Sequence, residues 1–171
     1  MILQTERLTL RRLDSSDLAD LAEMLQNPEV MYAYEHDFTD SDVREWLDRQ
    51  LMRYDKHGFG LWAAILRQTG EMIGQAGLTM QPYNGGEVLE IGYLLKQKHW
   101  HCGYAREAAA GCRDYAFNSL GSDKVHSIIK SDNYPSMRVA ESIGMTKEDE
   151  FIARYYNGDM LHVLYSMKKQ K

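Results

Sequence analysis

"EIGYLLKQKHWHCGYAREAA", residues 90–109, decides the fold of this chain. Its apolar beginning predicts a strand, and the small residues from Gly103 onward open a helix after a short loop. The first N–H groups of a helix have no partners within the helix, and its N-terminal end is positive. Because Gly103 and Ala105 let a ligand approach this backbone, the stretch predicts a site for an anion such as a pyrophosphate.

A metal site is the alternative for the same loop. His99, His101 and Cys102 stand close together, but they supply at most three ligands where zinc takes four, or three and an open position. The remaining histidines have no neighbour at ligand spacing. We therefore expect no metal here, and the phosphate interpretation is preferred.

Length and charge limit the class of protein. With 171 residues, 44% hydrophobic and 26% charged, the chain is expected to form a single domain over residues 1–171. The net charge of −5 gives no overall footprint for nucleic acid, so no nucleic-acid partner is expected.

Membrane and disulfide signals are weak. The longest apolar run, Leu61 to Leu66, is too short to cross a bilayer, so no membrane partner is expected. Cys102 and Cys112 are too few for a disulfide framework, which favours the reducing cytoplasm as the location.

The hydrophobic periodicity predicts the other elements. A helix capped by Asp14 or Ser15 ends at Asn27-Pro28, and Thr39 with Asp42 resembles the capping box of a second helix. Further helices are expected at 104–120 and 136–143, and strands at 6–13, 60–66, 72–80, 88–95, 125–130, 151–156 and 160–167. Antiparallel neighbours with one β-α-β unit in the middle define a mixed α/β or α+β fold.

Four motifs in order carry a family resemblance. They are "TERLTLR" at 5–11, "EIGYLL" at 90–95, "WHCGYAREAA" at 100–109 and "NYPSMRVAESIGM" at 133–145. Together they resemble the GNAT superfamily of acetyl-CoA-dependent N-acetyltransferases, in the branch that includes the ribosomal-protein N-terminal acetyltransferases. The resemblance runs from about residue 4 to 167.

The resemblance implies a mostly antiparallel central sheet with splayed central strands and flanking helices. It implies that acetyl-CoA binds with its pyrophosphate on the backbone of a loop, and with its pantetheine arm beside a strand, near Tyr93, Leu94 and Leu95. A freed amide near Leu94 would then steady the oxyanion. The loop residues that match the family pattern are His101, Cys102, Gly103, Tyr104, Ala105 and Arg106.

Two residues are candidates for proton transfer. Glu90 lies on the strand that would line the cleft and is our choice for the base, although a glutamate there could instead pair with a basic residue. Many family members carry a Tyr as acid where this chain has Ala140, so Ser136 is the substitute, with a helix cap as its alternative role. Asn133 would hold the cofactor arm or the loop, and Arg138 a CoA phosphate.

The acceptor is the least determined part of the sequence. Tyr32 to Phe38 and the pair Tyr155 and Tyr156, with Asp159, combine aromatic and acidic residues, which suits a cation-bearing acceptor or plain surface packing. By branch analogy the favoured acceptor is a peptide or protein α-amine. A small amine (polyamine, aminoglycoside or amino acid derivative) and a non-catalytic CoA-binding module are the alternatives. Members of this branch commonly dimerise, so a homodimer is a further expectation from the resemblance.

Overall fold

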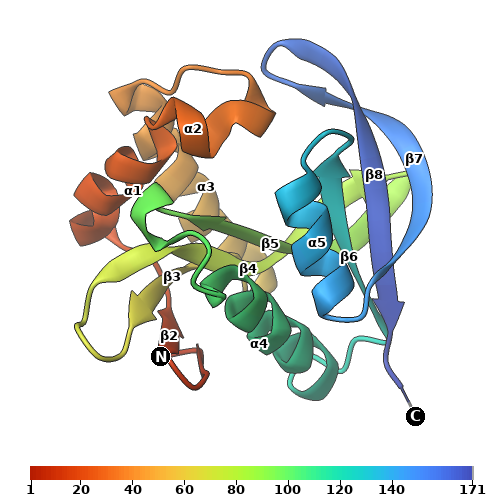
Figure 1. The fold of residues 1–171 in the computed structure, drawn as a ribbon, viewed down its shortest axis with the longest axis horizontal. Helices are drawn as coiled ribbons and strands as arrows, with labels where there is room; N and C mark the ends of the chain where they lie inside the picture. Colours follow the sequence, from red (N-terminus) through yellow and green to blue (C-terminus); the bar gives the residue numbers. More distant parts are fainter. Residues whose placement is uncertain (171) are drawn as a thin grey trace.

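The computed structural model describes residues 1–170 (Figure 1). Its strands are β1 (Leu3–Gln4), β2 (Leu8–Arg11), β3 (Leu61–Leu66), β4 (Met72–Tyr83), β5 (Gly86–Leu95), β6 (Lys124–Lys130), β7 (Thr146–Tyr155) and β8 (Gly158–Lys168). Its helices are α1 (Leu18–Leu25), α2 (Pro28–Met31), α3 (Asp40–His57), α4 (Tyr104–Asn118) and α5 (Tyr134–Ser142). Single 3-10 turns occur at η1 (Ser15–Asp17), η2 (Tyr32–Tyr34) and η3 (Gln97–His99).

The strands form one 8-stranded sheet in the order β1-β2-β3-β4-β5-β6-β8-β7. Neighbouring strands are antiparallel except β5 and β6, which run parallel because α4 crosses over between them. The β5–β6 pairing is limited to Glu90 opposite His126, whereas β4 and β5 pair from Gly74 opposite Leu95 to Tyr83 opposite Gly86. The two central strands therefore splay apart, and the predicted fold class is confirmed.

Helices cover both faces of the sheet (Figure 1). On one face α4 and α5 bury Cys112 and Ala140 against strand residues such as Ile91. On the other face α1 and α3 bury Leu21 and Trp46 in a second cluster. In residues 1–170, none of the helices is both long and apolar enough to cross a membrane. The β5–β6 gap consequently opens between two helical layers, away from the outer edges of the sheet.

The capping signals in the sequence are confirmed. The Thr39 hydroxyl accepts the Asp42 N–H at 3.2 Å, and the Asp42 carboxylate accepts the Thr39 N–H at 2.7 Å, which starts α3. Asp14 makes the corresponding capping box with Asp17 at η1. Gly158, with φ +111°, completes the turn between β7 and β8.

The first helix, α1, ends at Leu25, before Asn27-Pro28, as predicted. The sequence analysis missed the short helix α2 that follows: the Asn27 side chain accepts the Glu29 N–H at 2.9 Å and caps it, with Pro28 in the first turn, where it is tolerated. Other predicted boundaries were wrong. Asn133 likewise starts α5 at Tyr134, earlier than the expected 136. β7 begins before the expected 151, because residues 146–150 are exposed on both faces of an edge strand and show no apolar alternation.

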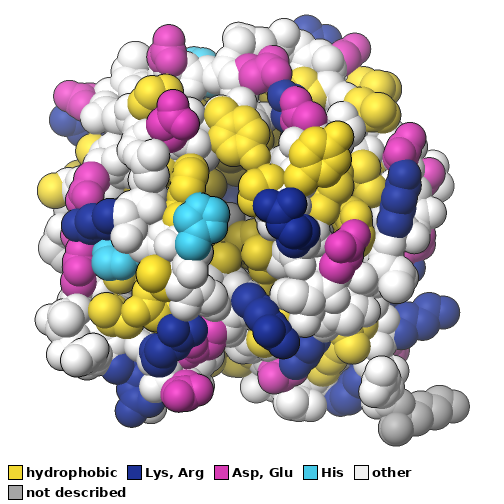
Figure 2. All heavy atoms as spheres, viewed as in Figure 1, with side chains coloured by type: hydrophobic (Ala, Val, Ile, Leu, Met, Phe, Trp, Pro, Cys, Tyr) yellow, Lys and Arg dark blue, Asp and Glu magenta, His cyan; other side chains and the backbone are white. Residues whose placement is uncertain are grey.

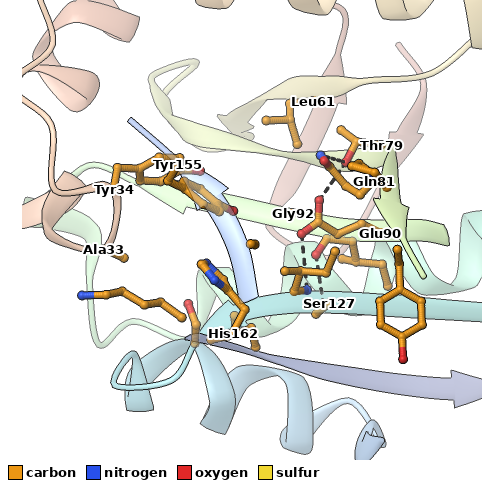
Figure 3. Close-up of a pocket in the computed structure, with 18 of the residues that line it drawn as sticks. Ala33, Tyr34, Leu61, Thr79, Gln81, Glu90, Gly92, Ser127, Tyr155 and His162 are labelled. Carbon is orange, nitrogen blue, oxygen red and sulfur yellow. Dashed lines mark hydrogen bonds between the residues drawn. The ribbon is translucent and has the colours of Figure 1, made fainter. Parts of the chain in front are cut away.

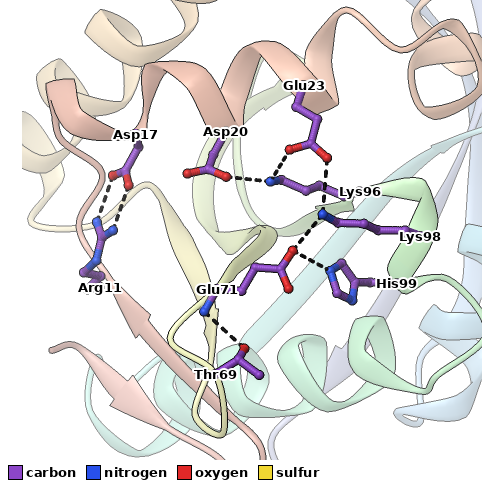
Figure 4. A network of polar contacts seen from close by, with 9 residues as sticks. All are labelled: Arg11, Asp17, Asp20, Glu23, Thr69, Glu71, Lys96, Lys98 and His99. Atoms are coloured by element: carbon purple, nitrogen blue, oxygen red, sulfur yellow. Dashed lines mark hydrogen bonds and ion pairs between the residues drawn. The ribbon is translucent and has the colours of Figure 1, made fainter.

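A polar network holds the segment that follows β5 (Figure 4). The Lys96 side chain is 4% exposed, and its ammonium donates to Asp20 and Glu23 at 2.5 Å each. Lys98 lies 2.8 Å from Glu71, just before β4. Since these contacts join α1 and the start of β4 to residues 96–98, they hold the connection that leads into α4.

Candidate active site

A cleft of ≈ 1080 Å³ opens where β5 and β6 part. Thr79, Glu90, Gly92 and Ser127 line it from β4, β5 and β6, while η2, α3 and β7 supply further lining residues (Figure 3). Glu90 and Gly92 are two positions apart on β5, so they share one face of the strand. A Cβ at Gly92 would lie 3.1 Å from the Leu61 side chain, so the glycine lets Leu61 pack closely against β5 beside Glu90.

The Glu90 carboxylate bonds to a backbone N–H of β6 that does not pair with the backbone of β5. It accepts the Ile128 N–H at 3.3 Å and the Thr79 hydroxyl at 2.9 Å (Figure 3). No Lys, Arg or His in residues 1–170 lies within ion-pair distance of it, so the alternative of a simple ion pair is wrong. Burial raises the pKa of Glu90 above its ordinary value, although these hydrogen bonds and the nearby Arg53 charge oppose the shift. A raised pKa makes the carboxylate more basic than an exposed one, which suits the acceptance of a proton.

The free edge of β5 is defined by the bonds its backbone makes. The Ser127 hydroxyl donates to the Ile91 carbonyl at 3.0 Å, and the Trp100 indole N–H donates to the Leu95 carbonyl at 3.0 Å. The N–H and C=O groups of successive residues point to opposite sides of a strand. In β5 those of the odd-numbered residues 91, 93 and 95 therefore point away from β4. By this alternation the N–H groups of Tyr93 and Leu95 point toward the gap, and that of Leu94 points toward β4. Of the three residues, Tyr93 and Leu94 line the cleft. The N–H groups of Tyr93 and Leu95 are therefore the candidates for the donor expected near Leu94.

The predicted phosphate loop is open and rich in free donors. His101 and Gly103 have positive φ angles of 60° and 80°, and α4 begins after Gly103 without a side-chain cap. The N–H groups of residues 101–106 find no acceptor within the described part of the chain. His101, Cys102, Gly103 and Arg106 are exposed. Successive free N–H groups at a helix N-terminus form an anion-binding concavity.

Arg7 braces this loop from the N-terminal strands. Its guanidinium donates to the Cys102 carbonyl at 3.0 Å and to Glu107 at 2.6 Å, and it lies 4.4 Å from the centre of the Tyr104 ring. Glu107 also accepts the Arg7 N–H at 2.7 Å and the Thr5 hydroxyl at 2.5 Å. The sequence offered Thr5 and Arg7 only as part of a family motif, and the structure gives them a contact with the loop.

The start of α5 borders the same cleft. The Asn133 side chain caps the helix by accepting the Ser136 N–H at 3.3 Å, and it also accepts the Tyr32 hydroxyl at 2.7 Å. The alternative role of Ser136 as the cap is therefore wrong. Its hydroxyl has no hydrogen-bond partner in residues 1–170, and both Asn133 and Ser136 line the cleft. Arg138 is exposed and lies outside the lining residues.

The wall of the cleft opposite α5 is aromatic. Tyr34 and Tyr155 pack edge to face, with ring centres 5.7 Å apart, and both line the cleft. Burial raises the pKa of both phenols, so they remain neutral. The acidic residues of the two expected acceptor segments do not line the cleft, and Glu35 instead pairs with Lys130 at 2.6 Å. This wall is therefore aromatic, without the expected acidic character.

Residues of α3 and β4 were missed as site residues. Arg49, Gln50 and Arg53 line the cleft from a helix for which the sequence predicted only an apolar stripe, and Gln75 lines it from β4. The signal in the sequence was the spacing of Arg49 and Arg53, one helical turn apart, which places both on one face.

The residues present fit a CoA thioester. Free N–H groups at the start of α4 match a pyrophosphate, and the unpaired edge of β5 matches the amides of a pantetheine arm. Figure 2 shows the face of the molecule that is turned to the viewer in Figure 1. This face is hollowed near its centre, with hydrophobic side chains inside the hollow and Lys and Arg side chains around it. A splayed sheet with these two features defines the class of acyl-CoA-dependent transferases.

Comparison with known proteins leads to the same family. The acetyltransferase (GNAT) domain matches residues 7–146. YkkB of Bacillus subtilis (strain 168) is 40% identical over 144 residues, 84% of each chain, and the N-acetyltransferase p20 of Bacillus licheniformis is 32% identical over 151 residues, 85% of this chain and 83% of p20. The crystal structure of an acetyltransferase from Agrobacterium tumefaciens str. C58 superposes with a TM-score of 0.82 at 30% identity, covering 98% of this chain and 94% of that one. The chain belongs to the GNAT family, and it is an acetyl-CoA-dependent N-acetyltransferase.

Proposed function

We propose that this enzyme acetylates the primary amine of an acceptor by direct attack in a ternary complex, and that the favoured acceptor is a peptide or protein α-amine. The observation that carries the proposal is Glu90, the one carboxylate among the residues lining the cleft in the described chain, set at the point where β5 and β6 part. Bound acetyl-CoA supplies the thioester: the neutral amine nitrogen forms a bond to the acyl carbon, the C–S bond breaks, and the proton that the nitrogen then gives up passes to the leaving thiolate.

The cofactor residues follow from the free donors. The N–H groups of residues 101–106 hold the pyrophosphate, and those of Tyr93 and Leu95 bond the arm and face the oxyanion. Asn133 keeps the start of α5 against η2, which leaves the Ser136 hydroxyl directed at the cleft as the proton donor for the thiolate. Arg138, on the exposed side of α5, is proposed to neutralise a CoA phosphate.

Glu90 removes the proton of the acceptor ammonium, directly or through one water. Its hydrogen bonds from Thr79 and Ile128 hold the carboxylate in one orientation, and burial keeps its pKa raised. Activity is then expected to rise with pH as Glu90 loses its proton. The acid limb of the pH–rate profile should lie above the range of an exposed carboxyl group.

An extended acceptor is supported by the length of the cleft. Beyond Glu90 the lining continues along β4 and β5 to Gly86 and along β7 from Phe151 to Tyr156, away from the cofactor side. Glu90 and Gly86 are four residues apart on a strand, a span of about 13 Å. This length accommodates the first residues of a peptide, whereas a small amine would fill only the part beside Glu90.

The test is acetyl transfer to matched peptides. Purified enzyme, acetyl-CoA and a peptide with a free N-terminus should release thiol and give a product carrying one acetyl group on its α-nitrogen, located by fragment mass spectrometry. The same peptide with a blocked N-terminus should be inert. Transfer to small amines alone would overturn the peptide proposal, and CoA binding without turnover on any amine would favour a non-catalytic module.

A further inference from the structure

The charge of the cleft differs from that of the whole chain. The chain carries a net charge of −5, yet the charged residues lining the cleft are Glu90 and four cations: Arg49, Arg53, Lys130 and Arg154. Lys130 is neutralised by Glu35 at 2.6 Å and Asp132 at 3.2 Å. Arg154 is exposed on β7. Arg49, Arg53 and Arg154 thus have no ion pair in the described chain, and of these only Arg49 and Arg53, on α3, are partly buried.

Arg53 is a partly buried cation that makes no ion pair in the described chain. Its guanidinium donates to the Gln50 side-chain oxygen at 3.1 Å, and no carboxylate in residues 1–170 lies within ion-pair distance of it. Burial and the neighbouring Arg49 charge lower the pKa of Arg53, whereas the nearby Glu90 carboxylate raises it, and the guanidinium stays protonated at neutral pH. Like charges one turn apart on a helix repel each other, and a buried unpaired charge is costly. Both costs are relieved if an anion binds between the two side chains.

Gln75 adds an unused donor to the same wall. The Trp46 indole N–H donates to its side-chain oxygen at 3.1 Å. An indole can only donate, so this bond fixes the amide orientation and leaves the NH₂ group free. That nitrogen is buried and has no hydrogen-bond partner among the described residues. Because buried donors are nearly always paired and Gln75 lines the cleft, this nitrogen is a candidate donor to an acceptor oxygen of a bound molecule.

We propose that Arg49, Arg53 and Gln75 form an oxyanion subsite for the acceptor, which carries a carboxylate close to the amine that is acetylated. This inference rests on the proposed function, because it needs the amine at Glu90. The carboxylate belongs to a free amino acid or to an acidic residue at the start of a peptide. Polyamines, which bring only positive charge, are poor acceptors for this wall.

Matched acceptors test the subsite with the wild-type enzyme. A free amino acid is compared with its carboxamide, and a peptide with Asp at its second position is compared with the Asn peptide. An amine next to a carboxamide has a lower pKa than one next to a carboxylate, so a larger fraction of it is neutral and reactive at a given pH. Intrinsic reactivity therefore favours the amide, and a preference for the carboxylate must come from binding. We expect kcat/KM, followed by thiol release, to be about 30-fold higher for the carboxylate member of one pair. The pair that shows the preference identifies the source.

The variant Arg53→Gln separates the subsite from the chemistry. It should lower the ratio of kcat/KM for the carboxylate acceptor to kcat/KM for the amide acceptor about 30-fold, mainly through KM. Any effect of the lost Arg53 charge on the pKa of Glu90 acts on both acceptors alike and cancels in this ratio. Arg53→Lys should restore part of the preference, which a purely structural role would not produce. Arg44→Gln, an exposed position on the same helix, is the control and should behave like the wild type. Thermal unfolding of each variant checks that the fold is retained.

The outcomes distinguish the two proposals. Equal use of carboxylate and amide acceptors, or efficient turnover of spermidine, would overturn the subsite while leaving acetyl transfer intact. An Arg53→Gln enzyme that keeps the wild-type preference would also overturn it. Absence of turnover with every amine would overturn the proposed function as well.

Discussion

The two halves of the cleft are built differently. On the cofactor side the proposed donors are backbone N–H groups of residues 101–106 and of the β5 edge, presented by a glycine turn and a helix N-terminus. On the acceptor side the candidate groups are side chains of Glu90, Arg53 and Gln75, contributed by separate elements. A backbone site tolerates varied side chains, whereas a side-chain site changes with each substitution. Binding of the cofactor should therefore depend on loop shape, and choice of acceptor on individual residues.

The largest expected effect is the loss of activity when the Glu90 carboxylate on the acceptor side is replaced. Glu90→Gln should lower kcat about 100-fold, because general base catalysis contributes that order of rate. The acid limb of the pH–rate profile should vanish, since the amide does not titrate. CoA affinity should not change, which would separate the two halves. Glu87→Gln, exposed on the same strand, is the control, and an unchanged acid limb in Glu90→Gln would assign the base elsewhere.

Distorting the loop breaks the cofactor side instead. Gly103→Val forces a β-branched residue to φ +80°, at a cost of about 1–3 kcal/mol, so the loop should leave its binding shape and weaken CoA roughly 30-fold. Titration calorimetry measures this change. Gly121→Val carries similar strain at φ +68° in open space away from the loop and should bind CoA normally. Equal affinity in both variants would contradict a backbone site.

The Ser136 hydroxyl sharpens the comparison where the halves meet. Ser136→Ala should lower kcat about 10-fold without a change in thermal midpoint, because Asn133 and not Ser136 caps α5. Ser142→Ala, an exposed position at the end of the same helix, serves as the control. Full activity in Ser136→Ala would remove the hydroxyl from the mechanism.

The smallest effect concerns the support of the loop, outside the cleft. Lys96→Met should lower the free energy of unfolding by about 1 kcal/mol at pH 7, since its carboxylate partners are partly exposed and can rehydrate. The Lys96 bond lowers the pKa of Glu23, so this stabilisation is present above the unfolded carboxyl pKa of about 4.3 and is lost as the pH falls below it. Urea unfolding at pH 7 and pH 4 should show the difference narrowing, whereas a constant difference would assign the effect to packing. The exposed Lys98→Met is the comparison.

The cofactor side was predictable from the sequence because its signals are local. Gly103, the strand before it and the helix after it lie in one short stretch, and each constrains the backbone by itself. The limited pairing of β5 with β6, at Glu90 opposite His126, could not be predicted from the residues alone. The splaying of these strands was expected only from the family resemblance. The edge strand β7 began early because polar residues on both faces leave no periodic signal.

The acceptor side was largely hidden because it depends on tertiary contacts. Gln75 has an unused donor only because Trp46 donates to its oxygen, and Arg53 makes no ion pair only because no carboxylate of the described chain reaches it. Neither the unused donor nor the absent ion pair can be predicted from a residue type or from the spacing of residues in the sequence. The acidic segment that attracted the sequence interpretation instead pairs with Lys130 through Glu35.

Amide resonances give the most direct test that main-chain donors grip the cofactor. In ¹⁵N-labelled enzyme, CoA should shift the amide signals of residues 101–106 together with those of Tyr93 and Leu95. Pantetheine, which lacks the pyrophosphate, should shift only the latter two. CoA that binds while the 101–106 amides stay in place would contradict the account.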